Sequence, residues 1–335
     1  MGKKVAINGF GRTGRLAYRA ALERDSRLDI VAVNRGDPKS LAHLLKYDSV
    51  HGRLPLYVEV EGDEIVAGRN RTKVLYEPEP ADMPWKKLDA YLVIESSGKF
   101  RTREGASRHL EAGAEKVLIS APGSGKEKPD LTVVMGVNDH LYDPSIHHIV
   151  SNASCTTNCI APVVKVLNDE FGLESGYITT VHAYTNDQRV LDKSHKDMRR
   201  ARAAALNIIP TSTGAAKATG EVIPELNGKL DGIAMRVPVP TGSVVDFVGI
   251  LGRGADAEDV NNAFIEASKG SLRGILAYTD DELVSTDYIH NPYSAVVDGP
   301  LTMSNGKLVK VVAWYDNEWG YACRLVEMAE KMVGL

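Results

Sequence analysis

Short apolar runs that alternate with amphipathic stretches dominate the first 150 residues of the chain. The apolar runs predict strands at residues 3–8, 27–34, 89–95, 116–121, 131–136 and 148–151. Apolar residues at helical spacing predict helices at 15–23 and 103–112, the second ending before Gly113. Strands that alternate with helices are typical of an α/β domain with a parallel sheet.

The pattern changes after residue 155. A helix is predicted at 155–171, and a C-terminal helix is predicted at 318–333. Between them, longer strands are predicted at 177–184, 231–237, 243–251 and 307–315. This order predicts a second domain of the α+β class with a mixed or antiparallel sheet.

The first predicted strand runs directly into Gly9-Phe10-Gly11-Arg12-Thr13-Gly14, and a helix and a second strand follow by residue 34. A GxGxxG motif in this setting predicts dinucleotide binding. The first glycine allows the tight turn, the second lets the backbone approach a pyrophosphate, and the third permits close helix packing. The helix N-terminus supplies amide donors to the anion. From the residues alone, an ordinary strand–helix turn is the alternative.

The residue that follows the second strand bears on the choice of dinucleotide. NAD enzymes normally place Asp or Glu there to hold the ribose 2′-hydroxyl. Here the strand ends at Asn34 and is followed by Arg35-Gly36-Asp37. The fork geometry and charge of arginine suit the 2′-phosphate of NADP. Two alternatives stay open: Asp37 bends back to the ribose, or Arg35 is a solvent-exposed side chain without a ligand.

Composition excludes several classes of protein. The 335 residues leave room for two domains, and 43% apolar with 25% charged residues is ordinary for a globular chain. A net charge of −4 gives no global sign of a nucleic-acid or membrane partner. No apolar run approaches the ~20 residues of a membrane span, and the start MGKKVAINGFG lacks the features of a signal peptide or myristoylation site. Three cysteines suit a reducing, cytoplasmic setting.

The stretch SNASCTTNC, residues 151–159, holds two of those cysteines, and three interpretations compete. A disulfide between Cys155 and Cys159 does not suit a reducing compartment. Zinc needs three or four ligands, and only His147-His148 offers a further pair, so no metal site is predicted. The third interpretation is a nucleophile: Cys155 begins a predicted helix, where positive potential and free amides favour the thiolate. Cys159, one turn inside, is predicted to be a buried apolar residue.

His182 is the candidate base for that nucleophile. It stands late in the predicted strand 177–184, near the hydroxyls of Thr179, Thr180 and Thr185. A rigidly held imidazole next to a thiol is the arrangement that cysteine nucleophiles require. Other histidines lack such a setting and are predicted to have surface or core roles: His43, His51, His109, His140 and His290.

Two further segments predict anion recognition. Residues 211–217, TSTGAAK, place hydroxyls and a glycine before a short helix, which is a phosphate or oxyanion cradle or, alternatively, a simple helix cap. Arg236 is a cation within an apolar strand and needs a partner, for which a substrate phosphate would serve. The basic stretch 195–205 has acids nearby and predicts a subunit contact or an ion-pair network rather than nucleic-acid binding.

These residues closely resemble one family, the phosphorylating glyceraldehyde-3-phosphate dehydrogenases. The shared motifs, in the family's order, are INGFGRTGR, HLLKYDSVHG, SNASCTTNC, HAYTNDQ, RRARAAALNIIPTSTGAAKA, RVPVPTGSV and WYDNEWGY. The resemblance covers about residues 3–333, and SCTTNC followed by STGAAKA is its most specific part. It implies a Rossmann-type dinucleotide-binding domain made of residues 1–154 and 318–335, and a catalytic domain at 155–317. It also implies a homotetramer in which residues 183–207 form a loop toward a neighbouring subunit's cofactor.

The resemblance also implies roles for individual residues. Cys155 would be the nucleophile that forms a thiohemiacetal and then a thioester with glyceraldehyde 3-phosphate, and His182 its base. Substrate phosphate would be held by Thr185 and Arg236, and inorganic phosphate by Ser154, Thr213 and Gly214, with Thr156 also at the phosphate sites. Asn317 would orient the nicotinamide carboxamide, with Tyr321 beside it. The remaining cofactor residues would be Gly9, Phe10, Gly11, Arg12, Thr13, Gly14, Asn34, Arg35, Ser97, Lys193 and Ser194.

The chain departs from the family's NAD-using pattern at two places. The family's NAD enzymes usually have Asp where Arg35 stands, and Leu-Pro where Lys193-Ser194 stands. Members that use NADP are similar to this chain in lacking Leu-Pro and having Ser second. Both changes favour NADP, with use of both cofactors as the main rival. Ala183 and Ser97, where Ser and Thr are usual, should not change the reaction.

Three other functions compete with this interpretation. Erythrose-4-phosphate dehydrogenases are close relatives, but they usually lack the STGAAKA pattern. A cysteine hydrolase would use Cys155 and His182 without a dinucleotide, which the GxGxxG motif argues against. A catalytically idle NADP-binding sensor would not need an intact cysteine, histidine and anion sites. The sequence leaves the physiological direction of the reaction open.

Overall fold

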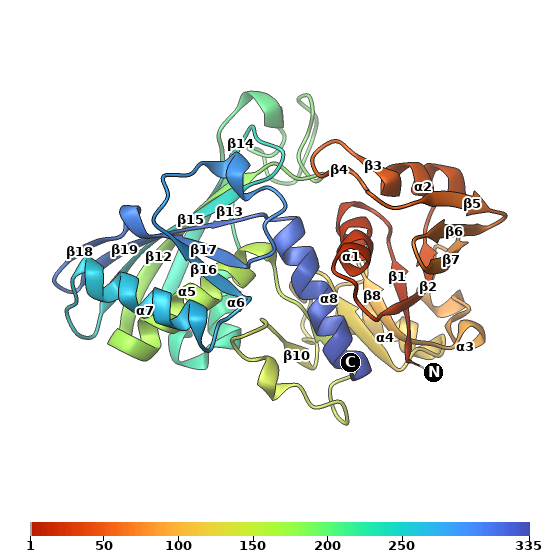
Figure 1. Ribbon diagram of the computed structural model, residues 1–335, viewed down its shortest axis with the longest axis horizontal. Helices are drawn as coiled ribbons and strands as arrows, with labels where there is room; N and C mark the ends of the chain where they lie inside the picture. The colour runs from red at the N-terminus through yellow and green to blue at the C-terminus, as the bar shows by residue number, and fades with distance from the viewer. Residues whose placement is uncertain (1) are drawn as a thin grey trace. The chain divides into compact units, whose positions relative to one another are not determined.

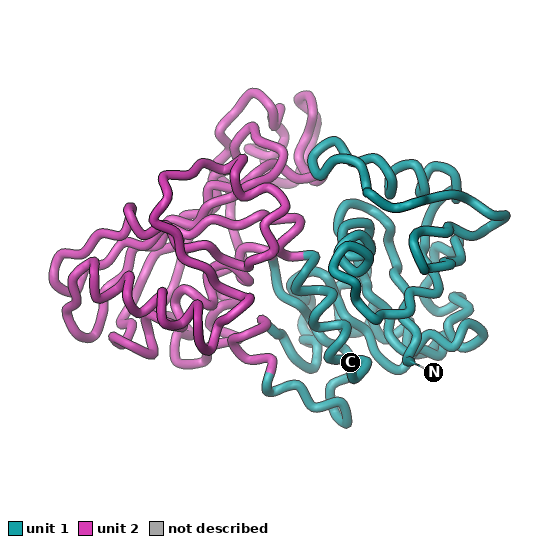
Figure 2. Tube along the Cα trace, in the orientation of Figure 1, with its two compact units in different colours: residues 1–133, 140–154, 322–335 teal, residues 134–139, 155–321 magenta. Residues whose placement is uncertain are grey.

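The computed structural model describes residues 2–335, so Met1, the first residue of the predicted 1–154 segment, lies outside the described part. The chain forms two compact units, which Figure 2 colours separately. Unit 1 contains residues up to 133 together with 140–154 and 322–335. Unit 2 contains residues 134–139 and 155–321.

Unit 1 is built on a nine-stranded sheet in the order β10-β11-β9-β8-β1-β2-β7-β6-β5 (Figure 1). Neighbouring strands from β10 to β7 run parallel, and β7, β6 and β5 form an antiparallel meander at the edge. The strands of this sheet are β1 (Lys4–Asn8), β2 (Asp29–Asn34), β5 (Val58–Glu61), β6 (Glu64–Ala67), β7 (Asn70–Leu75), β8 (Ala90–Glu95), β9 (Lys116–Ile119), β10 (Leu131–Thr132) and β11 (Ile149–Ser151).

The helices of unit 1 are α1 (Arg12–Glu23), α2 (Pro38–Lys46), α3 (Trp85–Leu88) and α4 (Arg103–Glu111), and a small hairpin is formed by β3 (Tyr47–Asp48) and β4 (Gly52–Arg53). Apolar side chains of the central strands pack with Trp85 and Met83 in one core cluster. The C-terminal part of α8 (Trp319–Val333) also belongs to this unit. There Arg24 pairs with Glu327, and the Ser26 hydroxyl donates to Glu330.

Unit 2 is built on an eight-stranded mixed sheet in the order β13-β14-β12-β15-β19-β17-β16, with β18 paired to β19. The pairs β12–β14 and β16–β17 are parallel, and the other pairs are antiparallel. Its strands are β12 (Leu173–Ala183), β13 (Ile209–Ser212), β14 (Leu230–Val237), β15 (Ser243–Leu251), β16 (Leu276–Thr279), β17 (Ala295–Asp298), β18 (Met303–Asn305) and β19 (Leu308–Tyr315).

Three helices pack on this sheet: α5 (Cys155–Phe171), α6 (Ala215–Val222) and α7 (Ala257–Lys269) (Figure 1). Alternate residues of β15 are buried, as expected for a strand with one face on a core. Residues 2–335 also contain six short 3₁₀ turns, at Pro80–Asp82, Asp139–Leu141, Ala204–Leu206, Pro224–Leu226, Ser285–Tyr288 and Gly299–Leu301. The predicted fold class, a Rossmann-type α/β domain plus an α+β domain with a mixed sheet, is confirmed.

The unit boundaries differ from the predicted division at two places. Residues 134–139 group with unit 2 because Gly136 packs against Leu272 and Ile275. Residues 318–321 group with unit 2 because Trp319 stacks on His290, with ring centroids 3.7 Å apart. The predicted strand 131–136 is correspondingly short and ends at Thr132, where the chain turns.

No helix among residues 2–335 is long and apolar enough to cross a membrane.

Candidate functional site

The turn that leads into α5 presents Cys155. Between β11 and α5, Ala153 has a φ of +53°, a left-handed conformation that costs a residue with a side chain about 1 kcal/mol or more. The sharp turn makes Cys155 the first residue of α5, partly exposed, and all three cysteines are free thiols. Cys159 is fully buried, as predicted.

His182, near the end of β12, lies beside that cysteine. Its Nε2 atom is 3.4 Å from Cys155 Sγ, and the side chain is almost fully buried. Its Nδ1 atom is 2.7 Å from the main-chain oxygen of Ala183, which can only accept a hydrogen bond. This contact favours the tautomer with the proton on Nδ1, because the two hydrogens of the nearby Arg236 Nη1 go to the Ala183 oxygen and Thr185 Oγ1. The Nε2 lone pair then faces the thiol. The ring of Tyr315 packs against the imidazole edge to face.

The charges of this pair differ from the sequence prediction. Burial, and then the nearby Arg236 cation, lower the pKa of His182 to about 3, so the imidazole is neutral. The pKa of Cys155 is raised because burial outweighs the opposing effects of Arg236 and of hydrogen bonds from Thr156 and the backbone. The amide donors at the start of α5 do favour the thiolate, as predicted, but burial has the larger effect on the pKa in the protein without ligands. Both pKa shifts favour a neutral thiol facing a neutral base.

Strand register places Arg236 next to His182. The two residues are direct partners across the parallel pair β12–β14. Arg236 Nη1 donates to the Ala183 oxygen at 2.9 Å and to Thr185 Oγ1 at 3.2 Å, and it lies 3.0 Å from His182 Nδ1. Its buried Nε has no partner, and no carboxylate among residues 2–335 pairs directly with this guanidinium. A buried cation in this condition is suited to an incoming anion.

An ion-pair network continues from Thr185 to a residue that sequence reasoning did not single out. Thr185 donates to Asp187, and Arg200 pairs with the same carboxylate. Arg200 Nε also donates to Thr211 Oγ1 at 3.0 Å, and Thr211 donates to Asp197. The ion-pair network predicted for residues 195–205 is therefore confirmed. Arg200 is close enough to lower the pKa of Arg236, so both cations belong to one positive region.

The other predicted phosphate residues occupy different settings. Thr156 is buried and its hydroxyl lies 3.0 Å from the hydroxyl of Tyr315, so a phosphate contact would have to use its main-chain N–H or break this bond. Gly214 is the N-cap of α6, and Thr213 Oγ1 accepts from the N–H of Ala215 at 3.2 Å. Ser154 is the last residue of unit 1 before Cys155.

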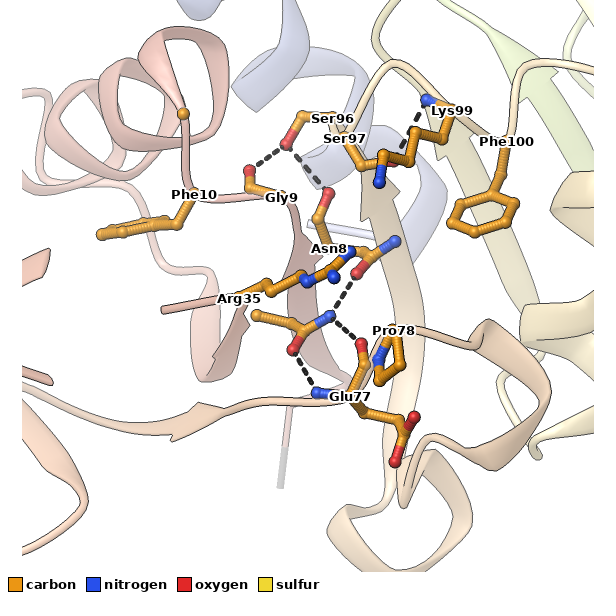
Figure 3. Close-up of a pocket in the computed structure, with 12 residues that line it drawn as sticks. Asn8, Gly9, Phe10, Arg35, Glu77, Pro78, Ser96, Ser97, Lys99 and Phe100 are labelled. Carbon is orange, nitrogen blue, oxygen red and sulfur yellow. Dashed lines mark hydrogen bonds between the residues drawn. The ribbon is translucent and has the colours of Figure 1, made fainter. Parts of the chain in front are cut away.

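Unit 1 contains a hollow of about 370 Å³ at the carboxyl ends of β1, β2 and β8 (Figure 3). This is the edge at which open parallel sheets bind ligands. The lining residues are Asn8, Gly9, Phe10, Gly11, Asn34, Arg35, Glu77, Pro78, Ser96, Ser97, Lys99 and Phe100. Six of the predicted cofactor residues are therefore together here: Gly9, Phe10, Gly11, Asn34, Arg35 and Ser97.

The glycines of the motif have distinct physical reasons. Gly9 has a φ of +95°, and a Cβ there would lie 2.4 Å from the nitrogen of Ser97. A Cβ on Gly14 would lie 2.2 Å from the oxygen of Gly9, so this glycine lets α1 pack against the strand end. A Cβ on Gly11 would meet no protein atom within 4 Å. The open space above Gly11 is what a cradle for pyrophosphate requires.

The neighbouring Arg12 and Thr13 open the helix. The helix α1 begins at Arg12, three residues earlier than predicted, because Gly11 serves as its N-cap. The guanidinium of Arg12 pairs with Asp48, whose pKa this contact helps hold at about 2. The side chain of Arg12 thus binds the β3–β4 hairpin through Asp48. Its main-chain N–H lies at the N-terminus of α1.

Arg35 and Asp37 take different positions after β2. Arg35 lines the hollow, is exposed, and makes no hydrogen bond or ion pair among the described residues; its guanidinium lies 5.9 Å from the centre of the Tyr76 ring. Asp37 caps α2, accepting from the N–H and the hydroxyl of Ser40, and its pKa is lowered by these bonds. The alternative in which Asp37 serves the ribose would compete with this cap.

The remaining predicted cofactor residues lie outside the hollow. Asn317 is buried, and its Oδ1 accepts from the Ser243 hydroxyl at 2.7 Å. Tyr321 is buried within α8. Lys193 and Ser194 are exposed on a loop of unit 2, where Arg189 donates to the Ser194 oxygen. No group of three or more His, Cys, Asp or Glu side chains among residues 2–335 is arranged to hold a metal ion.

Comparison with known proteins gives two family matches. The model described as "Glyceraldehyde 3-phosphate dehydrogenase, NAD binding domain" matches residues 3–103, and the C-terminal domain of the same enzyme matches residues 154–317. Among similar proteins, a glyceraldehyde-3-phosphate dehydrogenase of Streptomyces coelicolor is 56% identical over 97% of each chain. Those of Priestia megaterium and Geobacillus stearothermophilus are each 54% identical over 98% of each chain.

The matches define a dehydrogenase that uses a nicotinamide dinucleotide. The chain belongs to the glyceraldehyde-3-phosphate dehydrogenase family.

Proposed function

We propose that the chain catalyses the reversible phosphorylating oxidation of glyceraldehyde 3-phosphate to 1,3-bisphosphoglycerate and prefers NADP. The observation that carries the chemistry is the neutral imidazole of His182 at 3.4 Å from the thiol of Cys155. Unit 1 would bind the dinucleotide and unit 2 would hold the aldehyde. The relatives are named for the oxidation of glyceraldehyde 3-phosphate, and the residues of this chain supply a chemical route to the same reaction.

In this proposal, His182 Nε2 takes the proton of the Cys155 thiol as the sulfur attacks the aldehyde carbon. His182 passes that proton to the carbonyl oxygen, which completes a thiohemiacetal with a hydroxyl. The neutral imidazole then accepts the proton of this hydroxyl as a hydride leaves the carbon. A bound nicotinamide supplies the acceptor for that hydride. The product on Cys155 is a thioester, which inorganic phosphate attacks to release the acyl phosphate and the thiolate. The Nδ1–H to Ala183 contact holds the ring in orientation throughout.

Arg236 would bind the substrate's phosphate together with Thr185, and Arg200 would add a second positive charge. This assignment rests on the unpartnered Nε of Arg236 and on its distance to Thr185 Oγ1. Ser154, Thr213 and Gly214 would receive inorganic phosphate, for which the N-terminus of α6 offers amide donors. Two separate anion positions are needed because the reaction consumes a phosphorylated substrate and a free phosphate.

The preference for NADP rests on Arg35. Its guanidinium is exposed in the hollow and free of ion pairs, while the nearby carboxylate of Asp37 caps α2. A charge-assisted contact to the 2′-phosphate would contribute about 1.5–3 kcal/mol, or roughly 10–100-fold in affinity. Lys193 and Ser194 of a neighbouring subunit would complete this contact in a homotetramer.

An assembly of this kind agrees with the apolar exposure of residues 184–208. Large apolar side chains on that loop are mostly exposed: Val190 85%, Leu191 73%, Met198 81%, Leu206 79% and Ile208 68%. Contiguous exposed apolar residues commonly mark an interface. Light scattering across a range of protein concentrations would give the mass, and a stable monomer would overturn the tetramer. The three free thiols suit a reducing, cytoplasmic setting.

Steady-state kinetics test the proposed function. We expect NADPH formation that requires both glyceraldehyde 3-phosphate and inorganic phosphate, with kcat/KM higher for NADP than for NAD. Arg35→Ala should lower kcat/KM for NADP by roughly 10–100-fold and leave that for NAD unchanged. Arg27→Ala, which removes another exposed arginine of unit 1, is the matched control. Equal loss with both dinucleotides, or no loss with either, would contradict the role of Arg35.

A further inference from the structure

A buried chain of hydrogen bonds crosses the carboxyl ends of the central strands of unit 1. Register pairs Glu95 of β8 with Asn8 of β1, and Asn8 with Asn34 of β2. The side chains of these three residues are bonded to one another in that order, and all are almost completely buried. Asn34 continues the chain to the backbone of Glu77, just beyond β7 (Figure 3).

On the other side, the chain continues from Glu95 into two helices. His109 of α4 has its Nε2 atom 2.9 Å from Glu95 Oε2, and its Nδ1 accepts from the indole N–H of Trp85 at 3.0 Å. Since an indole nitrogen can only donate, Nδ1 of His109 must be the acceptor. The proton of the neutral ring is then on Nε2 and is donated to Glu95.

The direction of every bond is fixed from both ends. Asn34 Nδ2 donates to the Glu77 oxygen at 2.9 Å, and Asn34 Oδ1 accepts from the Glu77 N–H at 3.0 Å, so the amide of Asn34 cannot be reversed. Its Nδ2 also donates to Asn8 Oδ1 at 2.7 Å. The amide of Asn8 is therefore fixed too, and its Nδ2 donors point at Glu95 Oε2 at 2.5 Å.

Glu95 consequently receives donors alone. Its Oε2 accepts from Asn8 and His109, and its Oε1 accepts from the N–H of Ser97 at 2.8 Å and from the Ser97 hydroxyl. Three of these donors, the N–H groups of Asn8, His109 and Ser97, cannot accept a hydrogen bond, so both oxygens of the side chain must be acceptors, and an amide in this place would set an N–H group against a donor. No Lys or Arg among residues 2–335 pairs with it. A buried carboxylate without a cation is costly unless donors surround it in this way.

Three residues of this hydrogen-bond chain also line the hollow of unit 1: Asn8, Asn34 and Ser97. The carboxylate thus determines the position of Ser97, which begins the turn at 97–100 whose Lys99 and Phe100 form one wall. It also determines the spacing of the strand ends that form the floor. We propose that Glu95, supported by His109, is a positioning residue that presets this hollow for the dinucleotide. The inference rests on the proposal that the cofactor binds there.

The direction of the bonds provides a test by double-mutant cycle. Glu95→Gln puts an amide against the donors of Asn8 and His109, and Asn8→Asp puts a second carboxylate against Glu95. Each single change should weaken binding of NADP and NAD alike, by about tenfold or more. In Asn8→Asp/Glu95→Gln, the new amide donates to the new carboxylate, although His109 still faces that amide, so the double variant should lose less affinity than the two single losses combined.

Calorimetric titration of each purified full-length protein with NADP and with NAD measures these affinities. Glu79→Gln is the matched control, since it makes the same chemical change on a half-exposed carboxylate that pairs with Arg108. Its dissociation constants should stay within about twofold of the wild type. Thermal unfolding and the alkylation rate of Cys155 in unit 2 are recorded for each variant.

The outcomes separate the two proposals. Wild-type protein that binds neither dinucleotide would overturn the assignment of the hollow as the cofactor site. Wild-type binding with unchanged affinity in Glu95→Gln would overturn the positioning role alone. Lower thermal stability with unchanged affinity would mean that the buried hydrogen bonds serve stability alone, and this result would also overturn the positioning role. If a single variant does not fold, the double variant decides: restored folding and binding support the donor–acceptor match, and a double variant that also fails to fold contradicts it.

Discussion

The Nε2 atom of His182 lies 3.4 Å from the sulfur of Cys155, while Nδ1 of the same ring lies 2.7 Å from the main-chain oxygen of Ala183. One nitrogen thus faces the nucleophile and the other is held by the backbone. Arg236, the register partner of His182, keeps a positive charge beside the ring and disfavours its protonation. Burial, and then this charge, lower the pKa of His182, which favours a neutral base over an imidazolium paired with a thiolate.

Replacing the base should reduce turnover without affecting cofactor affinity. A positioned general base typically contributes about 10²–10⁴-fold to rate, so His182→Asn should lower kcat by that factor. His182 lies in unit 2 and does not line the hollow of unit 1, so the dissociation constant for NADP should be unchanged. Steady-state kinetics and titration measure the two quantities. His43→Asn, in α2, is the control, and wild-type turnover in His182→Asn would reject the assignment.

The pH dependence of thiol alkylation should reveal the charge state of the pair. Because the pKa of His182 is lowered to about 3, its imidazole does not titrate near neutral pH. Because the pKa of Cys155 is raised, its thiolate fraction should keep increasing with pH beyond about 8.5, the ordinary thiol value. The rate at which iodoacetamide reacts with the ligand-free protein should therefore increase with pH, and it should reach no plateau below about pH 8.5. A plateau already reached near pH 6–7 would show a preformed ion pair, roughly where free imidazole titrates.

Removing the cation next to His182 should affect only phosphorylated substrates. Arg236→Leu eliminates a buried guanidinium, and the lost charge-assisted bonds should raise KM for glyceraldehyde 3-phosphate roughly 10–100-fold. Turnover of unphosphorylated glyceraldehyde should change far less, since that substrate has no anion to bind. A similar loss with both aldehydes would mean that Arg236 acts through His182 and not on the phosphate. Arg253→Leu serves as the control, because Arg253 follows the end of β15 and donates to the main-chain oxygen of Glu170, not to a residue beside His182.

Alanine substitutions at Gly11 and Gly14 should affect different properties, dinucleotide affinity in the first case and thermal stability in the second. A Cβ at Gly14 would overlap the oxygen of Gly9, so Gly14→Ala should lower the unfolding temperature. A Cβ at Gly11 meets no protein atom and the residue has an ordinary φ of −77°, so Gly11→Ala should unfold at the wild-type temperature. Gly11→Ala should nevertheless weaken dinucleotide binding, because its methyl group occupies the space of the pyrophosphate. Unchanged affinity in Gly11→Ala would argue against that position for the ligand.

Much of the fold was predictable because local pattern and burial agree. The helix at 155–171 and the strand at 243–251 have the predicted bounds, since their apolar periodicities are long and uninterrupted. The helices at 38–46 and 257–269 and the meander at 58–75 were not identified, and elements as short as these take their stability mainly from packing against the rest of their unit.

The site was predictable in its residue types but not in its electrostatics. Cys155, His182 and Arg236 stood out by their settings in the sequence, yet the direction of the thiol's pKa depends on burial that only the assembled unit provides. Arg200 was overlooked because its link to Asp187 and Thr211 requires the loop to fold back onto β13. His109 was assigned a surface or core role, and its bonds to Glu95 and Trp85 depend on elements 14 and 24 residues away.

The most direct test of the central claim is mass spectrometry of the protein after brief mixing with NADP and glyceraldehyde 3-phosphate in the absence of inorganic phosphate. We expect a burst of one NADPH per chain and a phosphoglyceroyl adduct that maps to Cys155. Added phosphate should then discharge the adduct as an acyl phosphate. NADPH formation without an adduct, or an adduct on Cys159 or Cys323, would contradict the assignment of Cys155 as the nucleophile.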